Sequence, residues 1–206
     1  VGNVSHELQT PLAVCSNRLE ILLDRPDLNE EIAGELVKLH RSLQHLIRLN
    51  RTLLLLTRIE NGQFPEMMEV NLGTMLENGL KDNDELWSYK DISSSLKKNG
   101  EFRTVMNEQM ASVLIGNLVK NAFLYTPEGG SIEIQMSRTG FSISNDGNAP
   151  LDKEKVFRRF YQPSGRREGA TGLGLALVYS VCINNGLDIT YDYADGRHIF
   201  SIILRN

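Results

Sequence analysis

The sequence predicts two domains of different class, a helical hairpin over residues 1–63 and an α+β sandwich over residues 64–206. Residues 1–63 contain no Phe, Trp or Tyr, and all 14 aromatic residues of the chain follow them. Only three of the 17 glycines precede Gln63. Because Asn61-Gly62 and Pro65 would end any helix, we place the boundary near Gly62–Met68.

Apolar residues in the first domain recur at helical spacing. The two series are Val4, Leu8, Pro11 or Leu12, Cys15, Leu19 and Leu22, and then Ile32, Leu36, Leu39, Leu43, Leu46, Leu53 and Thr57. The turn Asp24–Asp27 separates them, with Asp27 or Asn29 available to cap the second helix of an antiparallel hairpin. The second helix has a wider apolar face than one hairpin can cover, so we expect dimerisation into a four-helix bundle. Asn50 falls on the apolar seam along which the helices would pack. There it either fixes the register of the helices or is a tolerated boundary residue.

Helix and strand patterns are mixed in the second domain. Helical periodicity covers Met110–Leu124 and Leu173–Asn184, and strand alternation covers Ser131–Ser137, Phe141–Asn145, Leu187–Tyr193 and His198–Leu204. Tandem strands with separate helices predict an α/β sandwich, with a sheet on one side and helices on the other.

Composition argues against several classes of protein. With 22 Lys+Arg against 26 Asp+Glu, the formal net charge of -4 argues against a nucleic-acid-binding protein. Cys15 and Cys182 lack the spacing of a metal or redox site. Apolar runs such as Leu53–Leu56 are far shorter than the roughly 20 residues of a membrane span. The chain opens at Val1 without a signal peptide, and we expect it to be a fragment whose upstream part is missing.

His6 is the first candidate for chemistry. It lies about 200° around the helix from the apolar stripe and therefore faces solvent, where its neutral ring nitrogen could act as a nucleophile. Glu7 could orient the ring or take its proton, and Thr10 lies one turn on along the same face. A surface His beside Glu is common, so the pair alone supports a function only weakly. The other histidines lack such neighbours, and we expect all three to be surface residues: His40, His45 and His198.

Three segments could form a nucleotide site, although no G-x-x-x-x-G-K-[ST] phosphate loop occurs. Asn117 and Asn121 share one helical face, and their amide oxygens suit Mg²⁺, although such pairs also arise by chance. The strand Ile143–Gly147 ends in Asn-Asp-Gly, which either allows close approach to an adenine or forms an ordinary turn. Gly169–Leu175 is a glycine-rich loop that opens a helix, where free N–H groups favour phosphate oxygens.

The string Ser5-His6-Glu7-Leu8-Gln9-Thr10-Pro11-Leu12 closely resembles the H box of two-component sensor histidine kinases, from which it departs only at Gln9. The three nucleotide segments and Phe157–Tyr161 follow in the order of the family's N, G1, F and G2 boxes. The resemblance covers nearly the whole chain. For the second domain it implies the Bergerat ATP-binding fold, shared with gyrase B, Hsp90 and MutL.

The resemblance implies a role for each matching residue. His6 would accept a phosphoryl group, Glu7 would assist, and Thr10 would position water for dephosphorylating a partner. Asn121 would coordinate Mg²⁺, and residues from about 148 to 171 would form a lid over the nucleotide. Ten residues would contact ATP: Asn117, Asn121, Tyr125, Asn145, Gly147, Phe160, Gly172, Leu173, Gly174 and Leu175.

Two departures from the family pattern concern the ATP site. Leu124 occupies a position that is usually basic. Five cations could supply the missing charge: Lys120, Arg158, Arg159, Arg166 or Arg167. Asn145 stands where the family has an Asp that accepts from adenine, and its amide oxygen can still accept, with less strength than a carboxylate. Aligning Asp146 instead would restore an acid but break its spacing to Gly147.

The resemblance implies the core of a sensor histidine kinase, which phosphorylates His6 with ATP and Mg²⁺ and passes the group to an aspartate of a response regulator receiver domain. It also implies a homodimer through the N-terminal helices and a cytoplasmic location, as part of an inner-membrane protein whose membrane segments precede Val1. Leu124 and Asn145 leave open a degenerate kinase that acts as a dimeric phosphatase or scaffold. A conformational ATPase of the Hsp90 kind would need Glu in place of Asn117.

Overall fold

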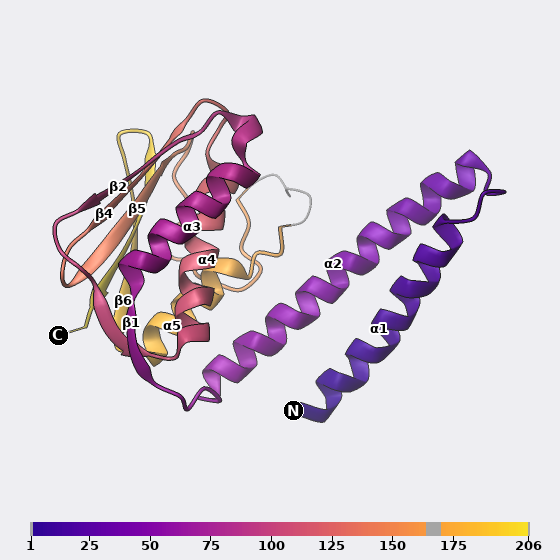
Figure 1. The fold of residues 1–206 in the computed structure, drawn as a ribbon, viewed down its shortest axis with the longest axis horizontal. Coiled ribbons are helices and arrows are strands. Elements are labelled where there is room, and N and C mark those ends of the chain that lie inside the picture. Colours follow the sequence, from indigo (N-terminus) through magenta and orange to yellow (C-terminus); the bar gives the residue numbers. More distant parts are fainter. Residues whose placement is uncertain (1, 164–169, 206) are drawn as a thin grey trace. The chain divides into compact units, whose positions relative to one another are not determined.

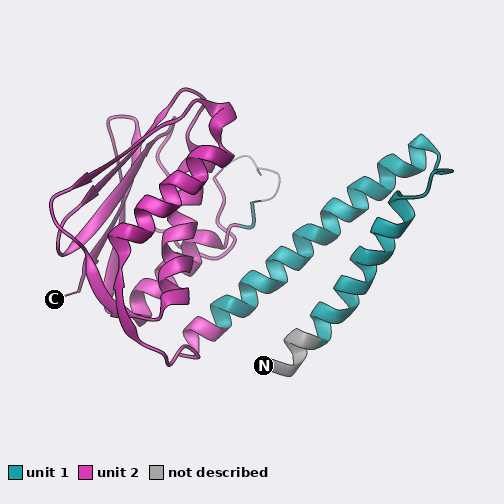
Figure 2. Cartoon of the chain, in the orientation of Figure 1, with its two compact units in different colours: residues 1–57, 167–171 teal, residues 58–166, 172–206 magenta. Residues whose placement is uncertain are grey.

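The computed structural model describes residues 2–163 and 170–205, with side chains from Glu7 onward. These residues form two compact units, one containing the hairpin through Thr57 and the other nearly all of the chain from Arg58 onward (Figure 2). The predicted fold class is confirmed, because a helical hairpin is followed by an α/β sandwich. The dimer and the domain boundary near residue 63 stay predictions.

The hairpin consists of α1 (Gly2–Leu23) and α2 (Glu30–Glu60). Of the two predicted caps, Asn29 is used: its Oδ1 accepts from the backbone N–H of Glu31 at 2.8 Å. α2 ends just before Gly62, which has a left-handed φ of 64°. Several large apolar side chains of the hairpin are exposed: Leu8, Ile21, Ile32, Leu39 and Leu46. Among the described residues, no helix is both long and apolar enough to cross a membrane.

A five-stranded sheet forms one layer of the second unit, in the order β2-β4-β5-β7-β6 (Figure 1). Its strands are β2 (Ser93–Lys98), β4 (Ser131–Met136), β5 (Gly140–Asp146), β6 (Leu187–Ala194) and β7 (Arg197–Leu204). β2 and β4 are parallel, and every other neighbouring pair in this sheet is antiparallel. A separate antiparallel pair consists of β1 (Met68–Asn71) and β3 (Arg103–Met106).

Helices cover one face of this sheet (Figure 1). They are α3 (Leu72–Leu86), α4 (Glu108–Tyr125) and α5 (Gly174–Asn184), and the short 3₁₀ turn η1 (Ser88–Lys90) follows α3. Asn107 caps α4 by accepting from the N–H groups of Gln109 and Met110, at 2.9 and 3.3 Å. The largest side chains of the core lie between helices and sheet, among them Phe102, Leu114, Leu118, Phe123, Ile132 and Ile134. This packing holds α4 and β5, which carry most of the predicted nucleotide residues.

Residues 68–106 contain elements that the sequence pattern did not predict. β2 lies at the edge of the sheet, and most of its six side chains are polar, so no alternation marks it as a strand. α3 has a recognisable signal, because Leu72, Leu76 and Leu80 are buried along one face and Asn71 caps the helix. Two glycines within α3 weaken that signal.

Candidate functional site

α1 carries the three N-terminal candidates. His6 lies in the first two turns of the helix, and its side chain falls outside the described part of the structure. Glu7 and Thr10 are exposed. Since Thr10 follows His6 by four residues, the two positions share one face of α1. Thr10 also lines a groove of about 540 Å³ between α1 and α2, together with Gln44 and Asn50.

The N-terminus of α5 approaches both predicted asparagines of α4. A Cβ atom at Gly174 would lie 2.9 Å from Asn117 Oδ1 and 3.8 Å from Asn121 Oδ1. Glycine is therefore needed at 174 for the helices to come this close. Asn117 Nδ2 donates to the carbonyl of Val113 at 2.7 Å, which fixes the orientation of the amide. The start of α5 and the middle of α4, which are far apart in the sequence, thus meet. Tyr125 lies one turn beyond Asn121 on α4.

The segment before α5 is shaped for close backbone contact. Gly172 has a φ of 68°, and a Cβ atom there would lie 2.8 Å from the backbone of Phe160. Phe160 N–H donates to the carbonyl of Gly172 at 2.8 Å, which joins the middle of the predicted lid to the residue that follows it. Leu173 is buried at the N-cap position and provides no side-chain cap. The first-turn N–H groups of α5, from Gly174 and Leu175 onward, therefore favour an anion.

Alternation along β5 places Asn145 and Asp146 on opposite faces of the sheet. Asn145 is 3% exposed and shares the helix-covered face with the buried residues Phe141 and Ile143. Its Nδ2 donates to the backbone carbonyl of Asp146 at 3.0 Å. Of the two alignments considered from sequence, Asn145 is thus the residue on the side of α4 and α5.

Asp146 takes part in a different network, on the other face. Its Oδ1 accepts from Arg197 Nη1 at 2.6 Å, and its Oδ2 accepts from Ser131 N and Oγ at 2.7 and 3.1 Å. These bonds tie the ends of β4, β5 and β7 together. The carboxylate therefore has a structural role, and it does not point toward the asparagine pair.

The donor set suits a divalent ion held jointly with phosphates. Within residues 2–163 and 170–205, no group of three or more His, Cys, Asp or Glu side chains could hold a metal ion. The oxygens near Gly174 belong to amides, which are hard ligands that Mg²⁺ accepts while keeping waters and bridging phosphates. Asn121 thus fits a shared magnesium site and would not by itself form a complete one.

Two family models match the chain. The phospho-acceptor domain of histidine kinase A matches residues 1–62, and the histidine kinase-, DNA gyrase B- and HSP90-like ATPase matches residues 106–205. The chain belongs to the sensor histidine kinases. It comprises the catalytic core of a kinase in two-component signalling, with both the phospho-acceptor and ATPase regions.

Relatives and solved structures agree with this family. The kinase is 34% identical to the sensor protein CiaH of Streptococcus pneumoniae over 88% of this chain and 43% of that protein. It is 29% identical to the sensor-like histidine kinase SenX3 of Mycobacterium tuberculosis, over 90% of this chain and 48% of that protein. The chain thus spans about half the length of these curated relatives.

Two solved structures share the fold over 98% of the chain. Full-length ShkA in complex with AMPPNP gives a TM-score of 0.75 at 22% identity, with 45% of that chain covered. The histidine kinase AdeS of Acinetobacter baumannii gives 0.63 at 23% identity, with 98% of that chain covered.

The described part of the kinase's predicted lid, up to residue 163, is anchored by packing and hydrogen bonds. Val156 is buried, and Phe157 stacks on Tyr179 of α5 with ring centroids 5.8 Å apart. Phe160, predicted to contact ATP, is 57% exposed and has a left-handed φ of 63°. Arg159 forms an ion pair with Glu60 at 2.5 Å. Among the five cations proposed to replace the charge absent at Leu124, Arg159 is thus paired, Lys120 and Arg158 are exposed, and Arg166 and Arg167 lie outside the described residues.

A cation does meet the end of α4, but it comes from η1. Lys90 Nζ donates to the carbonyls of Phe123, Leu124 and Thr126, each at 3.0 Å. It also lies 4.8 Å from the ring centroid of Trp87. No motif around Lys90 marks this role, because its acceptors belong to a distant part of the sequence.

The expectation that His40, His45 and His198 are surface residues is wrong, because all three are half-buried; His198 has the most distinctive surroundings. Its imidazole is partly buried between Tyr191 and Tyr193, with ring centroids 5.9 and 5.2 Å away. A Cβ atom on Gly147 would lie 2.2 Å from His198 Nε2. Gly147 is therefore needed for close approach to this ring, whereas an ordinary turn would not require it.

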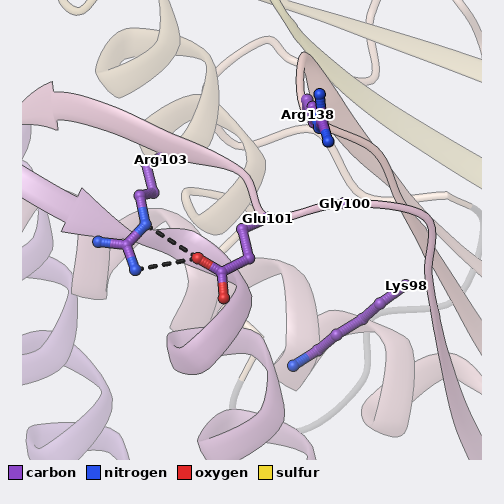
Figure 3. A pocket seen from close by; sticks show the side chains of 5 residues that line it. All are labelled: Lys98, Gly100, Glu101, Arg103 and Arg138. Carbon is purple, nitrogen blue, oxygen red and sulfur yellow. Dashed lines mark hydrogen bonds and ion pairs between the residues drawn. The ribbon is translucent and has the colours of Figure 1, made fainter.

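Figure 3 shows a second cavity, of about 570 Å³. It is lined by Lys98, Gly100, Glu101, Arg103 and Arg138. Arg138 lies in the connection between β4 and β5, whereas Asn145 lies near the opposite end of β5. Glu101 pairs with Arg103 at 2.9 Å, and Lys98 pairs with Glu77, so acidic groups offset much of the positive charge. The cavity contains none of the predicted site residues.

Proposed function

We propose that this chain transfers the γ-phosphoryl group of ATP to His6 and then to an aspartate of a response regulator. The observation that carries the proposal is the approach of Gly174 to Asn117 and Asn121. A helix N-terminus without a side-chain cap, next to two amide oxygens, suits a polyphosphate and its divalent ion. The match of residues 1–62 to the phospho-acceptor family supports His6 as the acceptor.

Each predicted residue has a place in this proposal. The adenine lies against Asn145 and Tyr125, and the phosphates lie at the start of α5 beside the backbone of residues 172–175. Mg²⁺ bound at Asn121 would neutralise phosphate charge. A nitrogen of His6 attacks the γ-phosphorus, the bond to the bridging oxygen breaks, and ADP leaves with the electron pair. Glu7 takes the imidazole proton, and Thr10 positions the water that later hydrolyses the phosphorylated regulator.

The hairpin is the proposed surface for dimerisation and for the regulator. Exposed leucines and isoleucines on α1 and α2 would be covered by a second hairpin in a four-helix bundle. Asn50 Nδ2 is buried without a hydrogen-bond partner among the described residues, which fits an amide that completes its bonding across a dimer seam. The receiver domain would dock around His6. We assign residues 1–63 to this domain, residues 64–206 to the ATP-binding domain, and the whole core to the cytoplasm.

Labelling with γ-labelled ATP and Mg²⁺ tests the proposal. Wild-type protein should acquire acid-labile, alkali-stable label, and His6→Gln and Asn121→Ala should both lose it. His40→Gln changes another histidine of the hairpin, and Asn184→Ala changes an exposed asparagine at the far end of α5, so both should keep the label. Label that persists in His6→Gln would refute the assignment of the acceptor.

The second candidate is a degenerate kinase that acts as a dimeric phosphatase or scaffold. Leu124 and Asn145 favour it, because each lacks a charge that the family pattern has at that position. Under this hypothesis the wild-type protein binds ATP yet acquires no label. It should still speed the loss of phosphate from a phosphorylated receiver domain, and Thr10→Ala should abolish that activity.

A further inference from the structure

One row of side chains crosses three strands on the helix-covered face of the sheet. Asn145 of β5 lies directly opposite His198 of β7, and His198 lies directly opposite Tyr193 of β6. Tyr191 lies two residues before Tyr193 on β6, so it is on the same face, where it is buried. His198 is thus the immediate neighbour of the residue proposed to meet the adenine.

These side chains hold the backbone that leaves β5. Gly147 packs against the imidazole edge of His198, and its carbonyl accepts from Tyr193 Oη at 3.0 Å. Four residues later, Leu151 N–H donates to Tyr191 Oη at 2.9 Å, and Tyr191 Oη lies 2.9 Å from His198 Nδ1. The segment from 147 to 151, which begins the predicted lid, is therefore fastened at both ends by a group centred on His198.

The hydrogen bonds around Tyr191 Oη suit a neutral His198 ring. Tyr191 Oη accepts from Leu151 N–H, so its single proton is free to be donated to His198 Nδ1. When Tyr191 donates in this way, Nδ1 acts as the acceptor and the neutral ring carries its proton on Nε2. A protonated imidazole would instead donate from Nδ1, and Tyr191 Oη would have to turn its own proton away and accept from both Nδ1 and Leu151 N–H.

We propose that neutral His198 is a positioning residue for the nucleotide site: through Tyr191 and Tyr193 it fixes residues 147–151 beside Asn145, and nucleotide affinity falls when His198 is protonated. This inference rests on the proposed binding of ATP at this site. His198 acts through its neighbours and takes no part in phosphoryl transfer.

The surroundings of His198 are consistent with a neutral ring. Burial lowers the pKa of His198 from its ordinary value of 6.5. The groups that face it are the two tyrosines of β6 and the uncharged Asn145 and Gly147 of β5. Two ion pairs lie nearby but do not face it: Asp146–Arg197 on the opposite face, and the exposed pair Lys153–Asp192. Affinity should thus be full above pH 6.5 and fall as the pH drops through the lowered pKa.

Binding of MgATP, measured from pH 5.5 to 8.5, tests this role. His198→Gln keeps an acceptor for Tyr191 but cannot titrate, and Tyr191→Phe keeps the packed ring but loses the hydroxyl. His40→Gln serves as the control histidine. Thermal unfolding of each variant at pH 8 checks that the fold is retained. Titration of the nucleotide itself is common to all variants and cancels in ratios of Kd.

The expected result has two parts. The ratio of wild-type Kd to His198→Gln Kd should rise roughly three- to tenfold toward low pH, the effect of one ordinary hydrogen bond, whereas the ratio to His40→Gln should stay constant. Tyr191→Phe should weaken binding at pH 8 by a similar factor. Suppose that wild type binds MgATP, that the ratio of its Kd to the His198→Gln Kd stays constant from pH 5.5 to 8.5, and that Tyr191→Phe binds as tightly as wild type. The positioning role is then overturned, while ATP binding stands. If wild type fails to bind at every pH, the proposed function fails, and this inference fails with it.

Discussion

Replacing Lys90 by Met removes a cation from the C-terminus of α4 while keeping most of the side-chain volume. Three carbonyls would lose their donor, those of Phe123, Leu124 and Thr126, each now 3.0 Å from Nζ. The carbonyls at a helix C-terminus carry partial negative charge and have no partner within the helix. The change therefore removes their charged donor at the end of the helix that carries Asn121.

The size of the effect follows from these contacts. A hydrogen bond to a charged group contributes about 1.5–3 kcal/mol, and one ammonium shared among three acceptors does not triple that figure. We expect a loss of about 2–3 kcal/mol in the free energy of unfolding, or roughly 6–10 °C in the midpoint for a domain of this size.

Fluorescence of Trp87 provides the assay. It is the only tryptophan of the chain and lies beside Lys90, so its unfolding midpoint reports on the second unit. Lys153→Met is the matched control: Lys153 pairs with Asp192 at 2.7 Å, but both side chains are 64% exposed, and the midpoint should stay unchanged within error. A Lys90→Met midpoint equal to that of the control would refute the reasoning that Lys90 stabilises α4.

Three further predictions concern packing and reactivity. Gly174→Ala should weaken MgATP binding about tenfold, because its Cβ would press on Asn117 Oδ1, and calorimetric titration measures this. Gly116 is exposed in α4, and no atom lies within 4 Å of the Cβ that alanine would add. The Gly116→Ala variant should therefore bind MgATP normally, and its free energy of unfolding in urea should rise by about 0.5–1 kcal/mol. A loss of stability would contradict the open space at this position. Burial raises the pKa of Cys182 to about 12, so a thiol reagent at pH 8 should label exposed Cys15 within minutes and reach Cys182 only after unfolding, as peptide mass spectrometry would show. Equal labelling of both cysteines in the native state would contradict the burial of Cys182.

Sequence periodicity predicted the elements whose burial is one-sided and regular. The predicted helix Met110–Leu124 corresponds to α4, and Leu173–Asn184 corresponds to α5 within one residue at the start. Both repeat apolar residues along a face that packs in the core. β2 could not be found in this way, because an edge strand with exposed polar side chains carries no alternation. Its place in the sheet depends on pairing with β4, which is encoded much further along the chain.

The candidate site shows the same division between local and distant information. Asn117 and Asn121 could be placed on one face from spacing alone, since helical geometry fixes the relation between residues four apart. The roles of Lys90 and His198 could not be predicted, because their partners come from other elements. Lys90 meets the end of α4, and His198 meets Gly147 across the sheet. Short motifs therefore identified the residues proposed to touch the nucleotide, but did not identify the residues that support them.

The order Asn145-Asp146 follows from the alternation of β5 and bears on the departure from the family pattern. A carboxylate at position 145 would lie on the buried face of the sheet, where none of the described residues offers it a cation. One of its oxygens would also face the backbone carbonyl of Asp146, to which the amide of Asn145 now donates. Asp146 can carry the charge because Arg197 and Ser131 satisfy it on the opposite face. In this chain the amide therefore suits the local structure of the sheet, and the weaker acceptor that it would offer to adenine in the proposed site is a consequence of that structure.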